Sequence, residues 1–118
     1  ALMSFSGSKA RILMLGLDAA GVFVVDSADW ERFPEAREEL DAILDSEEMK
    51  GVPFVVMANK QDLPGARGPM ELAEQLGLIK IQGHKWHVQG CCAATGDGLV
   101  EGMEVLANLV KQFQKTRS

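Results

Sequence analysis

The sequence predicts an α/β protein in which a parallel β-sheet is covered by helices on both faces. Two observations indicate this fold class. Short apolar runs rich in β-branched residues, each too short for a typical helix, recur along the chain, as in residues 22–25 and 53–58. Segments with apolar residues at helical spacing lie between these runs. Such alternation of strand and helix is typical of parallel sheets with helices on both faces.

The individual elements can be assigned in chain order. Strands are expected at residues 11–15, 22–25, 53–58 and 86–88. Helices are expected where apolar residues recur at helical spacing, first over Phe33, Ala36, Leu40, Ile43 and Leu44, then over Leu72, Ala73 and Leu76, and last over Leu99, Met103, Leu106, Val110 and Phe113. Pro34 and Pro69 suit first helical turns, and Gly77 ends the second helix.

Length and composition limit the possible functions. The 118 residues suffice for one domain with a real core but are few for a complete nucleotide-binding α/β unit. Residues 1–8 carry small polar side chains and are expected to be a disordered arm or a tag remnant, which assigns the single domain to residues 9–118. The net charge of −5 argues against nonspecific binding to nucleic acid or to anionic membranes.

Two further features concern the cellular compartment. No apolar run approaches the roughly 20 residues needed to span a bilayer, and no signal peptide is recognised. Cys91 and Cys92 are adjacent and cannot form a normal disulfide framework, which favours a reducing compartment, most simply the cytosol. A zinc site of these cysteines with His84 and His87 is disfavoured, because the spacing matches no common zinc motif.

Four polar residues follow the apolar run 53–58 and form the sequence N-K-Q-D. Ligands of open α/β sheets bind beyond the carboxyl ends of strands, where this tetrapeptide falls. The carboxylate of Asp62 can accept two hydrogen bonds side by side, which matches the N1–H and exocyclic NH2 groups of guanine. Asn59 can hold the loop or reach the purine edge, and the Lys60 stem can lie on the base. A plain surface turn is the alternative, because N-K-x-D also arises by chance.

A glycine-rich segment follows the first expected strand. Gly16 and Gly21 have the spacing of a phosphate-binding loop, whose full pattern is G-x-x-x-x-G-K-[ST]. In that loop, backbone N–H groups surround the phosphates, the lysine neutralises them and the hydroxyl binds Mg²⁺. Val22 and Phe23 occupy the positions of the lysine and the hydroxyl residue here. The spacing is therefore present without the side chains that normally act on phosphate and metal.

Together these stretches resemble the Arf-like (Arf/Arl) small GTPases. The residues that carry the resemblance are RILMLGLDAAG at 11–21, FVVDS at 23–27, ANKQDLPGA at 58–66 and CAATGDGL at 92–99, in the family's order. The resemblance implies a three-layer P-loop-type fold that binds GTP or GDP, with Mg²⁺ expected in the family and effector or regulator proteins as partners. By the same resemblance the phosphate loop begins with Gly16, Leu17, Asp18, Ala19, Ala20 and Gly21, guanine is read by Asn59, Lys60 and Asp62, and the loop that meets the guanine oxygen is Cys92, Ala93 and Ala94, through the backbone N–H of Ala93.

The departures from the family pattern all fall between Gly21 and Val22. There the family has the phosphate-loop Lys and Ser/Thr, a helix, the first switch with its Mg²⁺-binding Thr, two strands and the switch that carries the catalytic Gln. Without these groups no metal ligand or catalytic residue can be assigned, and we expect no GTP hydrolysis from this sequence. The acylation signal and the amphipathic helix of the family are also absent, so membrane anchoring is unsupported.

Three explanations of this gap remain open: a deletion or splice product, a sequence that omits a mobile segment, and a paralogue that lost its switches. The family's sheet pairs the strand 11–15 with the strand beginning near Val22 in parallel, and a parallel pair needs a connection of about a dozen residues or more. A parallel pair would therefore imply omitted residues, whereas a continuous chain predicts an antiparallel hairpin with residues 17–21 as its loop. We favour the parallel pair, because two strands and a helix are hard to remove from an intact core.

The function expected from the sequence is guanine-nucleotide binding by an Arf-like molecular switch that acts in membrane traffic or signalling. The alternative is a non-enzymatic interaction module that keeps the scaffold and neither binds GTP nor switches. A cytoplasmic protein is expected, with a peripheral position at intracellular membranes left open.

Overall fold

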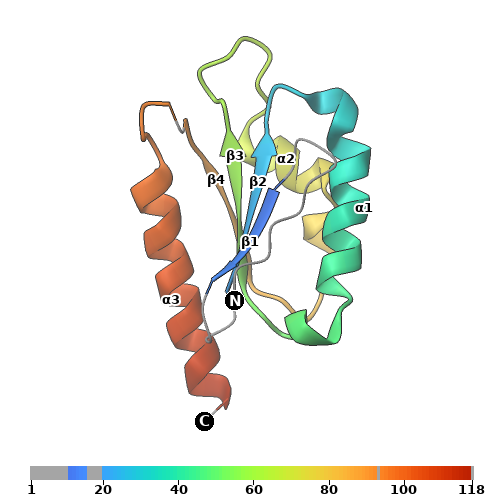
Figure 1. Ribbon diagram of the computed structural model, residues 1–118, viewed down its shortest axis with the longest axis vertical. Helices are drawn as coiled ribbons and strands as arrows, with labels where there is room; N and C mark the ends of the chain where they lie inside the picture. Colours follow the sequence, from blue (N-terminus) through green and yellow to red (C-terminus); the bar gives the residue numbers. More distant parts are fainter. Residues whose placement is uncertain (1–10, 16–19, 93, 118) are drawn as a thin grey trace.

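A computed structural model describes residues 11–15, 20–92 and 94–117 of the chain. Its centre is a four-stranded sheet with the strand order β1-β2-β3-β4 (Figure 1). The strands are β1 (Arg11–Leu15), β2 (Ala20–Asp26), β3 (Phe54–Asn59) and β4 (Trp86–Gly90), and the helices are α1 (Phe33–Leu44), α2 (Pro69–Gln75) and α3 (Leu99–Arg117). Short 3₁₀ turns lie at Trp30–Arg32, Glu47–Met49 and Leu78–Lys80. The order of elements agrees with the one expected from the sequence.

Strands β2, β3 and β4 are parallel, as predicted. Gly21 lies opposite Phe54 at the start of β2, and Asp26 lies opposite Asn59 at its end. Strand β4 continues this register beside β3, from Trp86 opposite Phe54 onwards. The connections between these strands contain α1 and α2, which supply the long crossovers that parallel pairs require. The three strands therefore end together at one edge of the sheet, here called the carboxyl edge, and begin together at the opposite amino edge.

Strand β1 runs the other way. It pairs with β2 in antiparallel register, with Arg11 opposite Val24 and Leu15 opposite Ala20. The expected parallel pairing of these strands is wrong, because only residues 16–19 separate them, too few for a parallel crossover. Gly21 and Val22 are consecutive residues of β2, so the chain follows the alternative of an antiparallel hairpin. Leu15, the last residue of β1, consequently lies at the amino edge.

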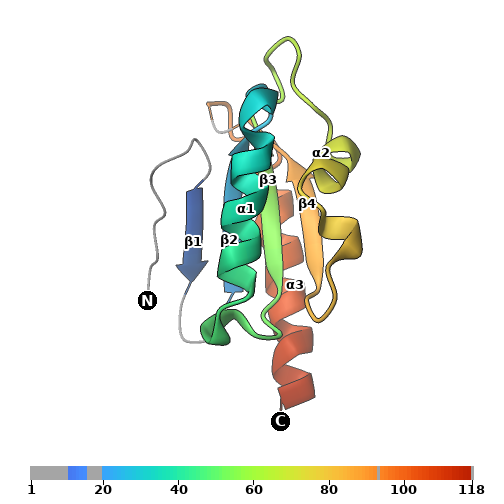
Figure 2. The same ribbon diagram turned by 90° about the vertical axis from the view of Figure 1, so that its right-hand side faces the viewer.

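Helices cover both faces of the sheet (Figures 1 and 2). The face covered by α1 and α2 buries a large cluster around Phe23, Val56 and Leu40. The opposite face packs on α3 through a smaller cluster that includes Val55, Met57 and Leu106. Alternate residues of β3 thus contribute to different clusters, which explains why its sequence is apolar without interruption.

The helix ends follow the local sequence. Pro34 and Pro69 occupy first-turn positions of α1 and α2, and Gly77 adopts a left-handed φ of 73° directly after α2. One detail of the predicted core is wrong: Met103 on α3 was expected to face inward but is 43% exposed.

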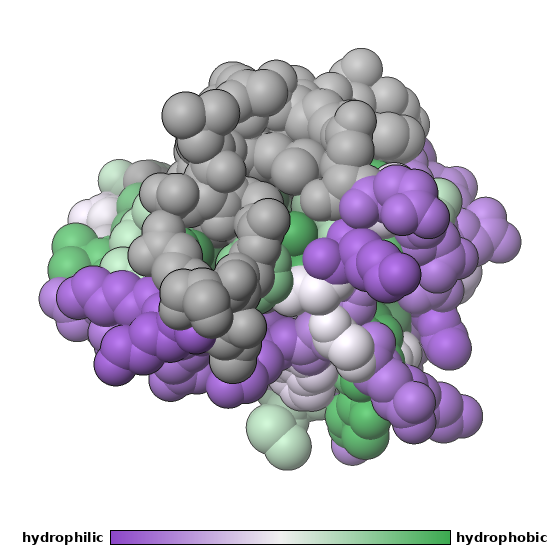
Figure 3. Space-filling model, turned by 90° about the horizontal axis from the view of Figure 1, so that it is seen from below, coloured by the Kyte–Doolittle hydropathy of each residue, from purple (hydrophilic) through white to green (hydrophobic). Residues whose placement is uncertain are grey.

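In the described part of the chain no helix is both long enough and apolar enough to cross a membrane. At the amino edge, seen from below, hydrophobic surface shows between groups of hydrophilic residues (Figure 3).

Candidate functional site

The loops that leave β2, β3 and β4 meet at the carboxyl edge. The N–H of Ser27, just after β2, donates to the Asn59 carbonyl at 3.0 Å, and the N–H of Cys91, just after β4, donates to the Ala58 carbonyl at 2.9 Å. The backbone pairing of β3 with its two neighbours therefore continues one residue past the end of β2, at Ser27, and one residue past the end of β4, at Cys91. Polar residues that are far apart in sequence are held together at this edge.

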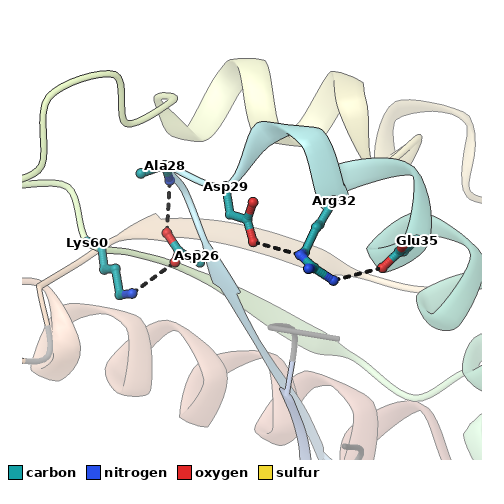
Figure 4. Close-up of polar contacts among 6 residues, drawn as sticks. All are labelled: Asp26, Ala28, Asp29, Arg32, Glu35 and Lys60. Atoms are coloured by element: carbon teal, nitrogen blue, oxygen red, sulfur yellow. Dashed lines mark hydrogen bonds and ion pairs between the residues drawn. The ribbon is translucent and has the colours of Figure 1, made fainter. Parts of the chain in front are cut away.

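Lys60 is the pivot of the loop after β3. Among the described non-glycine residues it alone has a positive φ, 64°, a conformation that costs an L-residue about 1–2 kcal/mol. Its Nζ lies 2.9 Å from Oδ2 of Asp26, whose Oδ1 accepts the Ala28 N–H at 3.0 Å (Figure 4). The hydrogen bond and the charge of Asp26 raise the pKa of Lys60 above its ordinary value. The Lys60 ammonium group is therefore directed towards the end of β2, and its carbon stem reaches from the loop after β3 to Asp26.

Gln61 joins the loop after β3 to the neighbouring loops by hydrogen bonds. Its Nε2 donates to Ser27 Oγ at 2.9 Å and to the Arg67 carbonyl at 2.8 Å, while its backbone N–H donates to the Cys91 carbonyl at 3.2 Å. Ser27 is completely buried, so this amide satisfies a hydroxyl that would otherwise be costly to bury. Gln61 therefore connects all three loops of the carboxyl edge.

The two cysteines after β4 contact two of the residues predicted to read guanine. Cys92 Sγ lies 3.3 Å from Oδ1 of Asp62, and Cys91 Sγ lies 3.9 Å from Oδ1 of Asn59. Both thiols are free and buried, whereas Asp62 is exposed. Burial, and secondarily the neighbouring Cys92, raises the pKa of the Cys91 thiol. The carboxylate of Asp62 is thus tethered at one oxygen and open to solvent elsewhere.

A hollow of about 460 Å³ lies beside Asp62, a volume within the usual range for small-molecule sites. It is lined by Gln61, Asp62, Gly90, Cys91, Cys92, Thr95, Asp97 and Gly98. A second hollow, of about 350 Å³, lies at the amino edge between the starts of β3 and β4 and the end of α3, and none of the predicted site residues lines it. The carboxyl-edge hollow is therefore the candidate site, because two predicted site residues, Asp62 and Cys92, line it.

Of the residues predicted to read the base, Asp62 and Cys92 line this hollow. Asn59 is the last residue of β3, Lys60 and Asp62 belong to the loop after it, and Cys92 and the exposed Ala94 belong to the loop after β4. Ala93 lies outside the described residues, so the expected contact of its N–H with the guanine oxygen stays a prediction. The acceptor pair of Asp62 and the neighbouring Asn59 amide suit the edge of guanine.

The predicted phosphate-loop residues do not lie at this hollow where the structure describes them. Gly16, Leu17, Asp18 and Ala19 lie outside the described residues. Ala20 and Gly21 belong to strand β2 at the amino edge, and the Gly21 N–H donates to the Pro53 carbonyl at 3.2 Å. The expectation that this pair lies in a phosphate-binding loop is wrong, because pairing with β1 and β3 draws it into the sheet. Five residue-to-residue steps along the strand, about 17 Å, separate Gly21 from Asp26.

The groups implied by the family resemblance can be tested against these residues. A guanine base fits the described carboxyl edge, where the carboxylate of Asp62 stands beside a hollow of suitable size. The phosphates and Mg²⁺ do not fit it: the described lining of the hollow holds no lysine or arginine, the Lys60 ammonium group is engaged by Asp26, and no described cluster of three His, Cys, Asp or Glu side chains could hold a metal ion. No step that involves phosphate or metal can be derived for these residues.

Sequence reasoning missed Asp26, Ser27 and Gln61 as parts of the site. Asp26 and Ser27 entered only as part of the segment 23–27 that carries the family resemblance, and Gln61 only as the variable position of N-K-x-D. The sequence nevertheless contains a signal for Asp26 and Ser27. The rule that drew attention to Asn59, a polar residue directly after a buried parallel strand, applies equally to Asp26 and Ser27.

The sequence also matches the family model of the ADP-ribosylation factors over residues 22–110. This range begins at Val22, directly after the departure from the family pattern, and it contains β2 from Val22 onwards, β3, β4 and the whole candidate site. It covers three quarters of the 118 residues. The chain therefore belongs to the ADP-ribosylation factor family.

Proposed function

We propose that this protein binds guanine nucleotides chiefly through the base, at the carboxyl-edge hollow. The observation that carries the proposal is the tethered carboxylate of Asp62 beside that hollow. The carboxylate would accept the N1–H and NH2 donors of guanine. Membership of the ADP-ribosylation factor family supports a guanine ligand.

The proposed affinity is low, because few contacts contribute to it. Two hydrogen bonds to a charged group contribute about 1.5–3 kcal/mol each, and part of that energy offsets the cost of association, so a Kd in roughly the millimolar range or weaker is expected. Since Lys60 is paired with Asp26, phosphate groups add little to this affinity. Guanosine, GDP and GTP are therefore expected to bind within about threefold of one another, with or without Mg²⁺.

Titration calorimetry with guanosine, GDP, GTP and the adenine counterparts tests the proposal. The wild type is expected to prefer guanine over adenine ligands regardless of phosphate number. Asp62→Asn presents an amide that suits xanthine better, so guanine affinity should fall at least about tenfold and xanthosine should gain relative to guanosine. Asp45→Asn removes the same charge after α1 and is the matched control. Equal binding of guanine and adenine ligands by the wild type would refute the proposal.

A second candidate function is the GTP-dependent switch expected for the family, with effector and regulator proteins as partners in membrane traffic or signalling. Family membership favours it. A switch must discriminate GTP from GDP, so a strong dependence of affinity on the third phosphate in the same titration would favour it over recognition of the base alone. We also propose a cytoplasmic location, which is supported by the two adjacent free thiols.

A further inference from the structure

The hollow of about 350 Å³ at the amino edge takes no part in the proposed function. Its volume lies near the lower end of the range for small-molecule sites. Three apolar side chains line it: Pro53 just before β3, and Leu109 and Phe113 on the last turns of α3. Pro53 is buried, whereas Leu109 and Phe113 are half-buried. The hollow therefore exposes part of an apolar wall to solvent.

The space beside the Phe113 ring is open because glycines line it. Both Gly51 and Gly83 belong to the lining of the hollow. A Cβ at Gly51 would contact Cε1 of Phe113 at 3.6 Å, and a Cβ at Gly83 would meet nothing within 4 Å. A ligand can therefore lie against the Phe113 ring on the side of Gly51, where a larger side chain would compete with it for space.

Two polar residues of this hollow, His84 and Lys85, are fixed by hydrogen bonds. Nδ1 of His84 lies 2.8 Å from the Val52 carbonyl, and because a carbonyl only accepts, this nitrogen carries the proton. The His84 ring also packs edge-on against Phe54, with 6.0 Å between the ring centroids. The Lys85 carbonyl accepts the Phe54 N–H at 3.0 Å. Both residues are thus held against the start of β3 before any ligand binds.

Lys85 gives the hollow a local positive charge. It is the one lysine, arginine, aspartate or glutamate in the described lining. Its Nζ donates to Oε1 of Gln112 at 2.9 Å, and no carboxylate of the described residues pairs with it. Asp41 and Asp45 line a neighbouring hollow that shares only His84 with this one. An unpaired ammonium group beside an apolar wall matches a ligand that joins a carboxylate to an apolar body.

We propose that the amino-edge hollow binds a small aromatic carboxylate. The ring of the ligand would lie on the apolar wall beside Phe113, where aromatic pairs gain from offset or edge-to-face contact. The carboxylate would accept a charge-assisted hydrogen bond from Lys85, which supplies a cation in a chain of net charge −5. This site lies at the edge opposite to the guanine hollow, so the inference does not depend on the proposed function.

NMR titration of the full chain with 2-naphthoate tests the site. A ligand of about 13 non-hydrogen atoms is expected to bind with a Kd on the order of 1 mM. The backbone amide signals of Gly51, Gly83 and Lys85 should shift, whereas those of Asp62 and Gly98 at the carboxyl edge should not. Shifts confined to the carboxyl edge, or no shifts up to about 10 mM ligand, would overturn the inference.

Two further ligands separate the parts of the recognition. 2-Naphthamide keeps the rings without the negative charge, and decanoate keeps the charge without a ring. Each is expected to bind at least about threefold more weakly than 2-naphthoate. Equal affinity for naphthoate and naphthamide would refute the role of the carboxylate, and equal affinity for naphthoate and decanoate would refute the role of the ring. Asp62→Asn, which tests guanine recognition, should leave naphthoate binding unchanged.

Two variants assign these contacts to residues. Lys85→Met keeps the stem and removes the charge, so affinity for 2-naphthoate should fall about fivefold while that for 2-naphthamide stays unchanged. Lys80→Met, at an exposed lysine outside the described lining, is the matched control. Phe113→Leu keeps an apolar side chain and should abolish the preference for naphthoate over decanoate. Equal losses in Lys85→Met and Lys80→Met, or an unchanged preference in Phe113→Leu, would contradict the proposed contacts.

Discussion

The two edges of the sheet carry two halves of one nucleotide-binding sequence pattern. The half at the carboxyl edge lies beside a hollow, whereas the described residues of the other half are part of a strand. At the carboxyl edge, N-K-Q-D and the loop after β4 meet beside a hollow, joined by Gln61 and the cysteines. At the amino edge, Ala20 and Gly21 are strand residues bonded to their neighbours. The difference shows that a motif becomes a site only where the connections of the chain bring its parts to one edge.

Chain length between strands accounts for the difference. The connections from β2 to β3 and from β3 to β4 contain helices and are long enough for right-handed parallel crossovers, so these strands end at the same edge. Only residues 16–19 connect β1 to β2, which permits a hairpin and not a crossover. The carboxyl end of β1 is therefore turned towards the edge where β2 and β3 begin.

The largest expected effect concerns a pair of glycines at the carboxyl edge. Gly98 and Gly96 both have left-handed φ values, 81° and 85°, but a Cβ at Gly98 would clash with the Gly90 carbonyl oxygen, whereas a Cβ at Gly96 meets nothing within 4 Å. Gly98→Ala should lower the free energy of unfolding by about 3 kcal/mol or more, from backbone strain plus overpacking, and Gly96→Ala by about 1 kcal/mol. Urea denaturation measures both. Equal losses would mean that the loop after β4 is not packed as described.

An intermediate effect on stability is expected at the amino edge. A substitution of Gly21 tests whether this glycine is a strand residue or part of a phosphate-binding loop. A Cβ at this position would lie 3.2 Å from Phe54 Cβ and 3.3 Å from Met49 Cε, so the neighbours must shift slightly. Gly21→Ala should cost at most about 1 kcal/mol of stability. Affinity for guanosine and for GTP should stay unchanged in calorimetric titrations. A selective loss of GTP affinity would indicate that Gly21 contacts phosphate, contrary to its position in β2.

The smallest effect is expected from the ion pair of Lys60 with Asp26. Because the folded state raises the pKa of Lys60, the stabilisation by the pair is fully present below the ordinary value of 10.5 and is lost as pH rises through the higher folded value. The stability difference between wild type and Lys60→Met should therefore shrink above pH 10.5. Lys50→Met, at an exposed position after Glu47–Met49, controls for general charge loss. A difference that grows with pH would contradict the pairing.

The sequence by itself determined the elements and the parallel core. The β-branched apolar runs of β2 and β3, the helical spacing of α1 and the prolines at the helix starts depend on local geometry, which can be read from neighbouring residues. It also located the carboxyl-edge loop, because the order strand, loop, helix fixes which end of a parallel strand bears polar residues. Asn59, Lys60 and Asp62 were found in this way.

Only the tertiary structure decided which residues meet. The antiparallel pairing of β1, the ion pair of Lys60 with Asp26 and the contact of Cys92 with Asp62 join residues whose pairing no local pattern specifies. The glycine spacing at 16–21 is compatible with a phosphate loop and with a hairpin alike, since both need tight turns. The number of residues between β1 and β2 decides between the phosphate loop and the hairpin, because a parallel crossover needs about a dozen residues or more. That number is a property of the whole chain and not of the motif.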